Sequence, residues 1–190
     1  MMQPVNWSQT YSGLAFDYDN MEGHEFSPLD FAHSLALLCR YNGHCLRFYS
    51  VAEHLVRCSY VAPPEFAFEA LMHDVSEAYL SDMPRPLKAL MPEYKALEKR
   101  VEEAICKKYK LPFPMSPEVK EVDNRMLLVE KDIVMCPPPY KWETYGVKPY
   151  SFYEYLLAEE DYPHLANSWQ DAKYAFLDRY NILYEEHLNA

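Results

Sequence analysis

The sequence predicts an all-α protein. No segment alternates apolar and polar residues with the period of two that marks a half-buried strand. Instead, apolar residues recur every three or four positions in several stretches, and prolines or Gly43 separate these stretches. We therefore expect about six or seven helices.

The length of 190 residues and the hydrophobic content of 49% allow one domain with a sizeable core. We expect a single domain over residues 1–190. Its core, which carries the motifs described below, would span about 28–135, and a helical extension would span 140–190. Residues 1–26 are rich in Tyr, Asp and Asn and are expected to be irregular.

The first expected helix begins after Ser27, because Ser is a favourable N-cap and Pro28 suits the first turn. It ends before Gly43. A second helix is expected over 51–61, and it stops at the two prolines that follow. A third is expected over 65–80.

The second half of the chain predicts three longer helices. Residues 93–110 form an amphipathic pattern with an apolar stripe. A helix from Ser116 to about Met135 is ended by three prolines, and another begins at Ser168. Residues 140–165 show no clear pattern.

The composition excludes several classes of function. The formal net charge of −11 opposes binding to a nucleic-acid polymer, although a metal ion can reverse the local field for a small nucleotide. There is no Gly-rich phosphate loop. Five cysteines without a CxxC pair fit reduced thiols in the cytoplasm, and no segment is typical of a membrane span or signal peptide.

The stretch ALMHDVSEAYLSD at 70–82 brings His73 and Asp74 together in an apolar neighbourhood, and Glu77 and Asp82 follow. Burial of these groups without partners would cost several kcal/mol. On a helix, His73, Asp74 and Glu77 would lie on adjoining faces.

Two further helices carry polar residues on apolar faces. His54 lies among apolar residues of the second helix, and Asp123 lies at the edge of the apolar stripe of the helix that follows Ser116. A divalent cation would pair with His54, His73, Asp74 and Asp123 together. Mixed imidazole and carboxylate ligands favour Mn, Fe, Co, Ni or Zn over Mg or Ca.

These motifs resemble a known family. The order H…HD…D is similar to that of HD-domain metal-dependent phosphohydrolases. The segments SVAEH (50–54), HDVSEAYLSDMPRPLK (73–88) and VKEVD (119–123) resemble bacterial 5'-deoxynucleotidases and phage-type HD hydrolases, including phage dATP triphosphohydrolases. The short interval between His54 and His73 is more like the phage-type group.

The resemblance implies a compact helical bundle around one metal ion and a homo-oligomer. It implies that Glu77 is the general acid or base or positions the attacking water. It implies that Asp82 contacts the deoxyribose hydroxyl or supports a second metal. Arg40 matches a substrate-binding Arg. The relatives have Trp where Tyr41 stands, which leaves the sugar preference open.

Phosphoryl transfer also requires positive charge on the phosphate, for which Arg47, Arg85 and Lys88 are candidates. We expect hydrolysis of (deoxy)nucleoside 5'-phosphates, with attack at the α-phosphorus and either orthophosphate or triphosphate leaving. A triphosphate substrate would need more basic residues or additional metals.

Two alternatives remain open. A non-catalytic nucleotide sensor would keep the metal but would have no need of Glu77. An adaptor would bind WW domains through the PPPY motif at 137–140.

Overall fold

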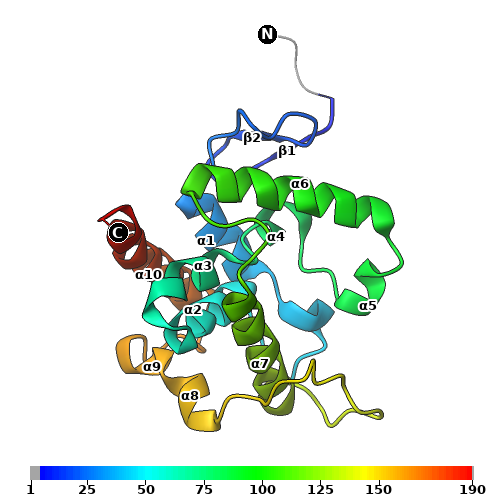
Figure 1. The fold of residues 1–190 in the computed structure, drawn as a ribbon, viewed down its shortest axis with the longest axis vertical. Helices are drawn as coiled ribbons and strands as arrows, with labels where there is room; N and C mark the ends of the chain where they lie inside the picture. The colour runs from blue at the N-terminus through cyan, green and yellow to red at the C-terminus, as the bar shows by residue number, and fades with distance from the viewer. Residues whose placement is uncertain (1–4, 190) are drawn as a thin grey trace.

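The structure is a computed structural model that describes residues 5–189. It is mostly helical, which confirms the predicted class (Figure 1). The larger helices are α1 (Pro28–Leu37), α2 (Val51–Val61), α3 (Ala67–Met72), α6 (Pro92–Tyr109), α7 (Pro117–Val134) and α10 (Trp169–Asn189).

A small hairpin near the N-terminus departs from the prediction of an irregular segment over 1–26, of which residues 1–4 lie outside the described part. Strand β1 (Trp7–Gln9) pairs antiparallel with β2 (Ala15–Asp17) above α6 (Figure 1). Strands of three residues are too short to give a periodic signal. The hairpin is anchored because the Phe16 side chain is fully buried and stacks on Tyr79.

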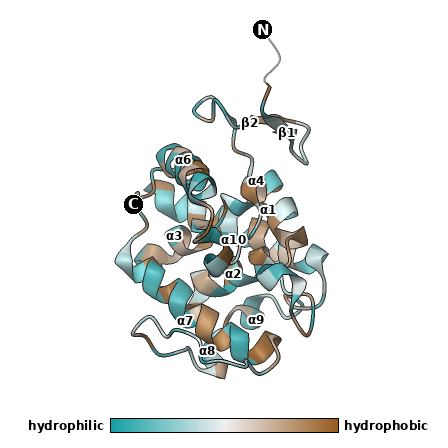
Figure 2. Cartoon of the chain, turned by 90° about the vertical axis from the view of Figure 1, so that its right-hand side faces the viewer, coloured by the Kyte–Doolittle hydropathy of each residue, from teal (hydrophilic) through white to brown (hydrophobic). Residues whose placement is uncertain are grey.

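Helix α2 passes through the centre of the molecule and packs against α1, α3, α7 and α10. Residues 51–59 are all buried, including the charged side chains of Glu53 and Arg57, which pair with each other. The outer helices α6 and α7 instead show hydrophobic and hydrophilic faces, as expected at a surface (Figure 2). The side chains at 51–59 are therefore held by neighbours, which makes α2 a rigid base for His54.

The predicted helix over 65–80 is wrong in its continuity. The chain forms the 3₁₀ turn η2 (Pro64–Phe66), then α3, and then turns at 73–76 before α4 (Glu77–Leu80). In this turn the backbone bonds join residues three apart, such as Glu77 N–H to the Asp74 carbonyl at 3.1 Å. The tightened turn sets His73 and Asp74 at the end of α3, rather than on the side of a long helix.

Shorter elements complete the fold. Another 3₁₀ turn, η1 (Arg40–Gly43), follows α1, and α5 (Arg85–Lys88) precedes α6. After α7 a long loop over 136–151 leads to α8 (Phe152–Leu156) and α9 (Ala158–Asp161). Within residues 5–189, no helix combines the length and apolar character that crossing a bilayer requires.

Candidate metal centre

Four side chains converge where α2, the turn after α3, and α7 meet. They are His54 on α2, His73 and Asp74 in the turn, and Asp123 on α7. Each offers one nitrogen or oxygen atom, and these atoms all lie within 4.8 Å of one another. The structure thus brings together the four ligands that the sequence predicts.

The pairwise distances describe a compact cluster. The Nε2 atoms of His54 and His73 lie 3.3 Å apart. Asp123 Oδ1 lies 3.6 Å from His54 Nε2 and 3.8 Å from His73 Nε2. Asp74 Oδ2 lies 3.8 Å and 3.3 Å from the same two nitrogens.

The other nitrogen of each ring is already used. His73 Nδ1 donates to the Ala70 carbonyl at 2.8 Å, and His54 Nδ1 donates to the carboxylate of Glu130 at 2.5 Å. A carbonyl or carboxylate oxygen can only accept, so both Nδ1 atoms carry hydrogen. When the rings are neutral, their Nε2 atoms are acceptors that face the cluster.

Four acceptor atoms therefore face one another, two from imidazoles and two from carboxylates. Such a group repels itself unless a positive charge joins it. Two nitrogens and two carboxylate oxygens suit a divalent transition metal, and the imidazoles are held by outer partners as metal ligands usually are. The residues present thus fit a divalent cation.

The titration of the cluster indicates the same need for positive charge. Burial favours the neutral ring, yet the adjacent carboxylates of Asp74 and Asp123 hold the pKa of His73 well above its usual value. Burial likewise opposes ionisation of both carboxyl groups. The neighbouring His73 nevertheless lowers the pKa of Asp74 far below its usual range and that of Asp123 to about 2.

Glu77 and Asp82 lie at the edge of this cluster. Glu77 is buried, and its Oε2 atom has no hydrogen-bond partner within the described residues. Burial and then the nearby carboxylates of Asp74 and Asp82 raise the pKa of Glu77 well above its usual value. Burial also raises the pKa of Asp82. These shifts favour the protonated form of both carboxyl groups, and a protonated carboxyl group can serve as a proton donor.

Arg40 and Tyr41 reach the same region from η1. The Arg40 guanidinium lies 3.6 Å from Asp74 and 3.4 Å from Glu130, and it is almost fully buried. Tyr41 has φ 56° and ψ 31°, a left-handed conformation that is rare for a bulky residue. Such strain is found where a surrounding structure fixes a side chain, and here it directs Tyr41 towards Glu130.

The three candidate phosphate-binding residues divide into two groups. Arg85 bonds to Asp123 and, at 2.8 Å, to Asn124, and Lys88 pairs with Glu98. Arg47 lies elsewhere.

The Arg47 guanidinium makes two bonds to Glu53, at 2.7 and 2.9 Å, and one to the Tyr155 hydroxyl. It lines neither of the cavities at the cluster. Its charge is satisfied by the buried network around α2, so we leave it out of the proposed site.

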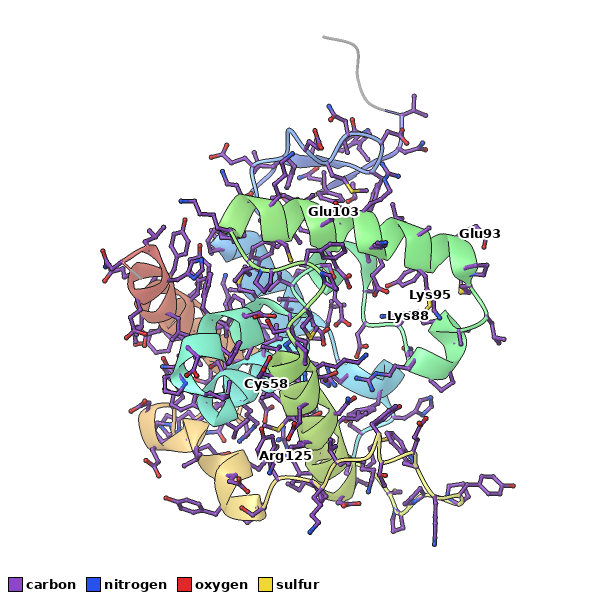
Figure 3. All side chains as sticks on the ribbon, viewed as in Figure 1. Cys58, Lys88, Glu93, Lys95, Glu103 and Arg125 are labelled. Atoms are coloured by element: carbon purple, nitrogen blue, oxygen red, sulfur yellow. The ribbon has the colours of Figure 1, made fainter. Side chains whose placement is uncertain are left out.

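Two cavities adjoin the cluster. The larger has a volume of about 790 Å³ and the smaller about 410 Å³. The larger extends between α6 and α7, and the side chains of Lys88 and Lys95 lie in this region (Figure 3). The smaller is bounded by Arg40, Tyr41, Glu77, Asp82 and Trp142, among others. Both cavities share Asp74, Arg85, Lys88, Asp123 and Tyr145.

Three residues of this region are not predicted from the sequence. Glu130 follows Asp123 by two helical turns on α7, so the spacing of seven could have indicated that they share a face. Trp142 and Tyr145 lie on the loop over 136–151, which has no periodic pattern. The Trp142 ring meets that of Tyr41 edge-on at 6.2 Å, and the Arg85 guanidinium lies over the Tyr145 ring at 5.0 Å.

The PPPY motif begins this loop. Its four residues are exposed, Tyr140 to 85%. The adaptor interpretation stays a prediction, since exposure is required for it but does not identify a partner.

No family model matches the sequence. The chain is 47% identical over 127 residues to the uncharacterized protein YfdR of Escherichia coli, a match that covers 67% of this chain and 71% of YfdR. It is 30% identical over 124 residues to an uncharacterized protein of Rhodobacter capsulatus, covering 60% of this chain and 63% of that protein.

Proposed function

Because the chain belongs to the family of the uncharacterized Escherichia coli protein YfdR, whose name assigns no activity, we propose a function from the site itself. The protein is a metal-dependent phosphohydrolase of the HD type that acts on (deoxy)nucleoside 5'-phosphates. The four acceptor atoms that face one another at the end of α3 are the observation that chiefly supports this function.

His54, His73, Asp74 and Asp123 would hold the cation, with Mn, Co, Fe, Ni or Zn favoured over Mg by the two imidazoles. When bound, the ion supplies Lewis-acid polarisation of a phosphoryl oxygen and makes a nearby water a stronger nucleophile. The rigid packing of α2 and the tight turn at 73–76 keep the ligands in place before the ion arrives.

Glu77 is the candidate general acid. Its raised pKa favours the protonated carboxyl group, and the leaving 5'-oxygen needs a proton when the bond to phosphorus breaks. The neighbouring Asp82, in the smaller cavity, is placed to accept a hydrogen bond from a sugar hydroxyl.

Arg40, Arg85 and Lys88 supply positive charge around the phosphate. Arg40 lines the smaller cavity, and Arg85 and Lys88 line both. Each is paired with a carboxylate in this structure, so a phosphate would share or replace that partner. Guanidinium groups suit the planar, two-point recognition of phosphate oxygens.

The two cavities suggest how a nucleotide would lie. Tyr41 and Trp142 give the smaller cavity aromatic walls against which a base can stack. Lys95, Lys99 and Lys120 line the larger cavity together with Glu69, Glu98 and Glu102, so its charge favours neither a triphosphate nor a monophosphate. The five unpaired thiols favour a reducing compartment, in agreement with a cytoplasmic nucleotide substrate.

The test is release of orthophosphate and triphosphate from a panel of dNMPs, NMPs and dNTPs with Mn²⁺, Co²⁺ or Mg²⁺. Asp74→Asn removes a candidate ligand, and Asp132→Asn is the matched control because that carboxylate is exposed and pairs only with Lys131. We expect release that Asp74→Asn abolishes and Asp132→Asn preserves.

The products identify the reaction. Orthophosphate from dNMPs would make the protein a 5'-deoxynucleotidase, whereas nucleoside and triphosphate from a dNTP would make it a triphosphohydrolase. Absence of release while the metal is bound would overturn hydrolysis of these substrates and would favour a nucleotide sensor.

A further inference from the structure

Glu130 lies on α7 directly behind the metal cluster and is completely buried. An isolated carboxylate in such a position would cost several kcal/mol, so its partners decide why it is there.

Each oxygen of Glu130 has two partners. Oε1 accepts from Tyr49 at 2.6 Å and from His54 Nδ1 at 2.5 Å. Oε2 accepts from the Tyr41 hydroxyl at 3.0 Å and lies 3.4 Å from Arg40 Nε. Three of these partners, His54, Arg40 and Tyr41, belong to the candidate site or its smaller cavity.

The bond to His54 has a direct consequence for the metal. A neutral imidazole carries its hydrogen on one nitrogen, and the hydrogen bond of one nitrogen decides which form is present. Since Glu130 accepts from Nδ1, the lone pair of His54 stays on Nε2, the atom that faces His73 and Asp123. The opposite tautomer would point a hydrogen into the cluster.

We propose that Glu130 is a positioning residue for metal binding, which acts by fixing the ring orientation and tautomer of His54. The inference rests on the metal centre of the proposed function but not on the substrate. Outer partners of this kind typically change metal affinity by about 10- to 100-fold when they are removed.

The test is titration of Mn²⁺ into the metal-free full chain, followed by calorimetry, for the wild type and Glu130→Gln. The Gln amide keeps the shape of the side chain but removes the charge. Its NH₂ group is a donor, and it would face either Tyr49 and His54 or Tyr41 and Arg40, which are donors themselves. We expect the dissociation constant for Mn²⁺ to rise about 10- to 100-fold.

Asp30→Asn is the matched control. Asp30 is also a buried carboxylate with two hydrogen bonds, both to Ser12, but it lies at the start of α1 away from the cluster. The Asp30→Asn variant reports the general effect of replacing a buried carboxyl group, and the affinity of this variant for Mn²⁺ should match that of the wild type.

A second measurement does not depend on the folding of a variant. Nitrogen-15 NMR of the imidazoles in the metal-free wild type, recorded at a pH where His54 is neutral, should show hydrogen on Nδ1 of His54. Hydrogen on Nε2 instead would overturn the proposal.

Equal Mn²⁺ affinity in the wild type and Glu130→Gln would also overturn it while leaving the metal centre intact. If the wild type bound no Mn²⁺, the metal centre would fail and the inference with it. Loss of affinity in a protein that hydrolyses no nucleotide would support the role of Glu130 and contradict only the proposed function.

Discussion

Replacement of Glu77 by Gln should make the protein more stable and less active. The carboxyl group is 5% exposed, and its Oε2 atom has no partner within the described residues. A buried polar atom without a partner costs about 1–3 kcal/mol. Gln leaves a polar atom in the same place but needs no proton to stay neutral. It therefore avoids the cost that a buried carboxyl group with a raised pKa carries at pH 7.5, where the unfolded chain ionises, and we expect the free energy of unfolding to rise by about 1 kcal/mol.

The same substitution removes the candidate general acid. Proton transfer by a positioned side chain contributes about 10²- to 10⁴-fold to rate, so kcat should fall by that factor. Mn²⁺ affinity should remain within a few-fold, because Glu77 is not among the four ligands. Denaturant unfolding, phosphate release and calorimetry measure the three quantities on one preparation. A Glu77→Gln variant with kcat near that of the wild type would refute the role in proton transfer, and a clear loss of stability would refute the account of its burial.

Three other predictions concern pH, metal and substrate. Burial, with Glu98 nearby, raises the pKa of Glu102 from its ordinary 4.5 to about 7. The folded protein therefore binds this proton more tightly than the unfolded chain, and the free energy of unfolding falls as pH rises from 4.5 to 7. The shift corresponds to about 3 kcal/mol, which solvent around the partly exposed side chain reduces. The free energy of unfolding of Glu102→Gln should thus exceed that of the wild type by about 1–2 kcal/mol at pH 8 and should hardly differ at pH 4.5. Denaturant unfolding at both pH values measures this difference, and a difference that does not depend on pH would contradict the prediction. Mn²⁺ at 100 times its dissociation constant should raise the free energy of unfolding of the wild type by about 2.7 kcal/mol. In Asp123→Asn, Mn²⁺ should give little of this stabilisation, which thermal unfolding with and without Mn²⁺ measures. If the Trp142 ring stacks on the base, Trp142→Ala should raise KM about 5- to 100-fold with little change in kcat. Tyr140→Ala is the control, because Tyr140 is an exposed residue of the same loop, and it should leave KM unchanged.

The long helices could be predicted because their apolar stripes and their stops are local features. The helices over 51–61 and after Ser116 lie where the sequence places them, which is why His54 and Asp123 were identified as buried polar residues. The break at 73–76 could not be predicted. The sequence there has no proline or glycine, and α4, which follows the turn, is held by a distant segment through the bond from Ser34 to the Ala78 carbonyl.

The cluster itself was predicted from residue types, whereas its surroundings were not. A metal site requires His, Asp or Glu at four positions, and these residue types can be recognised in a sequence. A loop that covers a cavity needs only a few contacts and does not require particular residue types. Trp142 is placed by Tyr41, about a hundred residues earlier in the chain, and no local pattern records that contact. Arg47 lies near the motifs in sequence, but its guanidinium bonds to Glu53 in the network around α2, a contact that the sequence does not indicate.

The most direct test of the metal centre is a crystal of the full chain soaked in Mn²⁺ and measured for anomalous scattering. We expect one strong peak coordinated by Nε2 of His54, Nε2 of His73 and one oxygen each of Asp74 and Asp123. A peak coordinated by other side chains, or no peak between α2 and α7 at saturating Mn²⁺, would contradict the assignment.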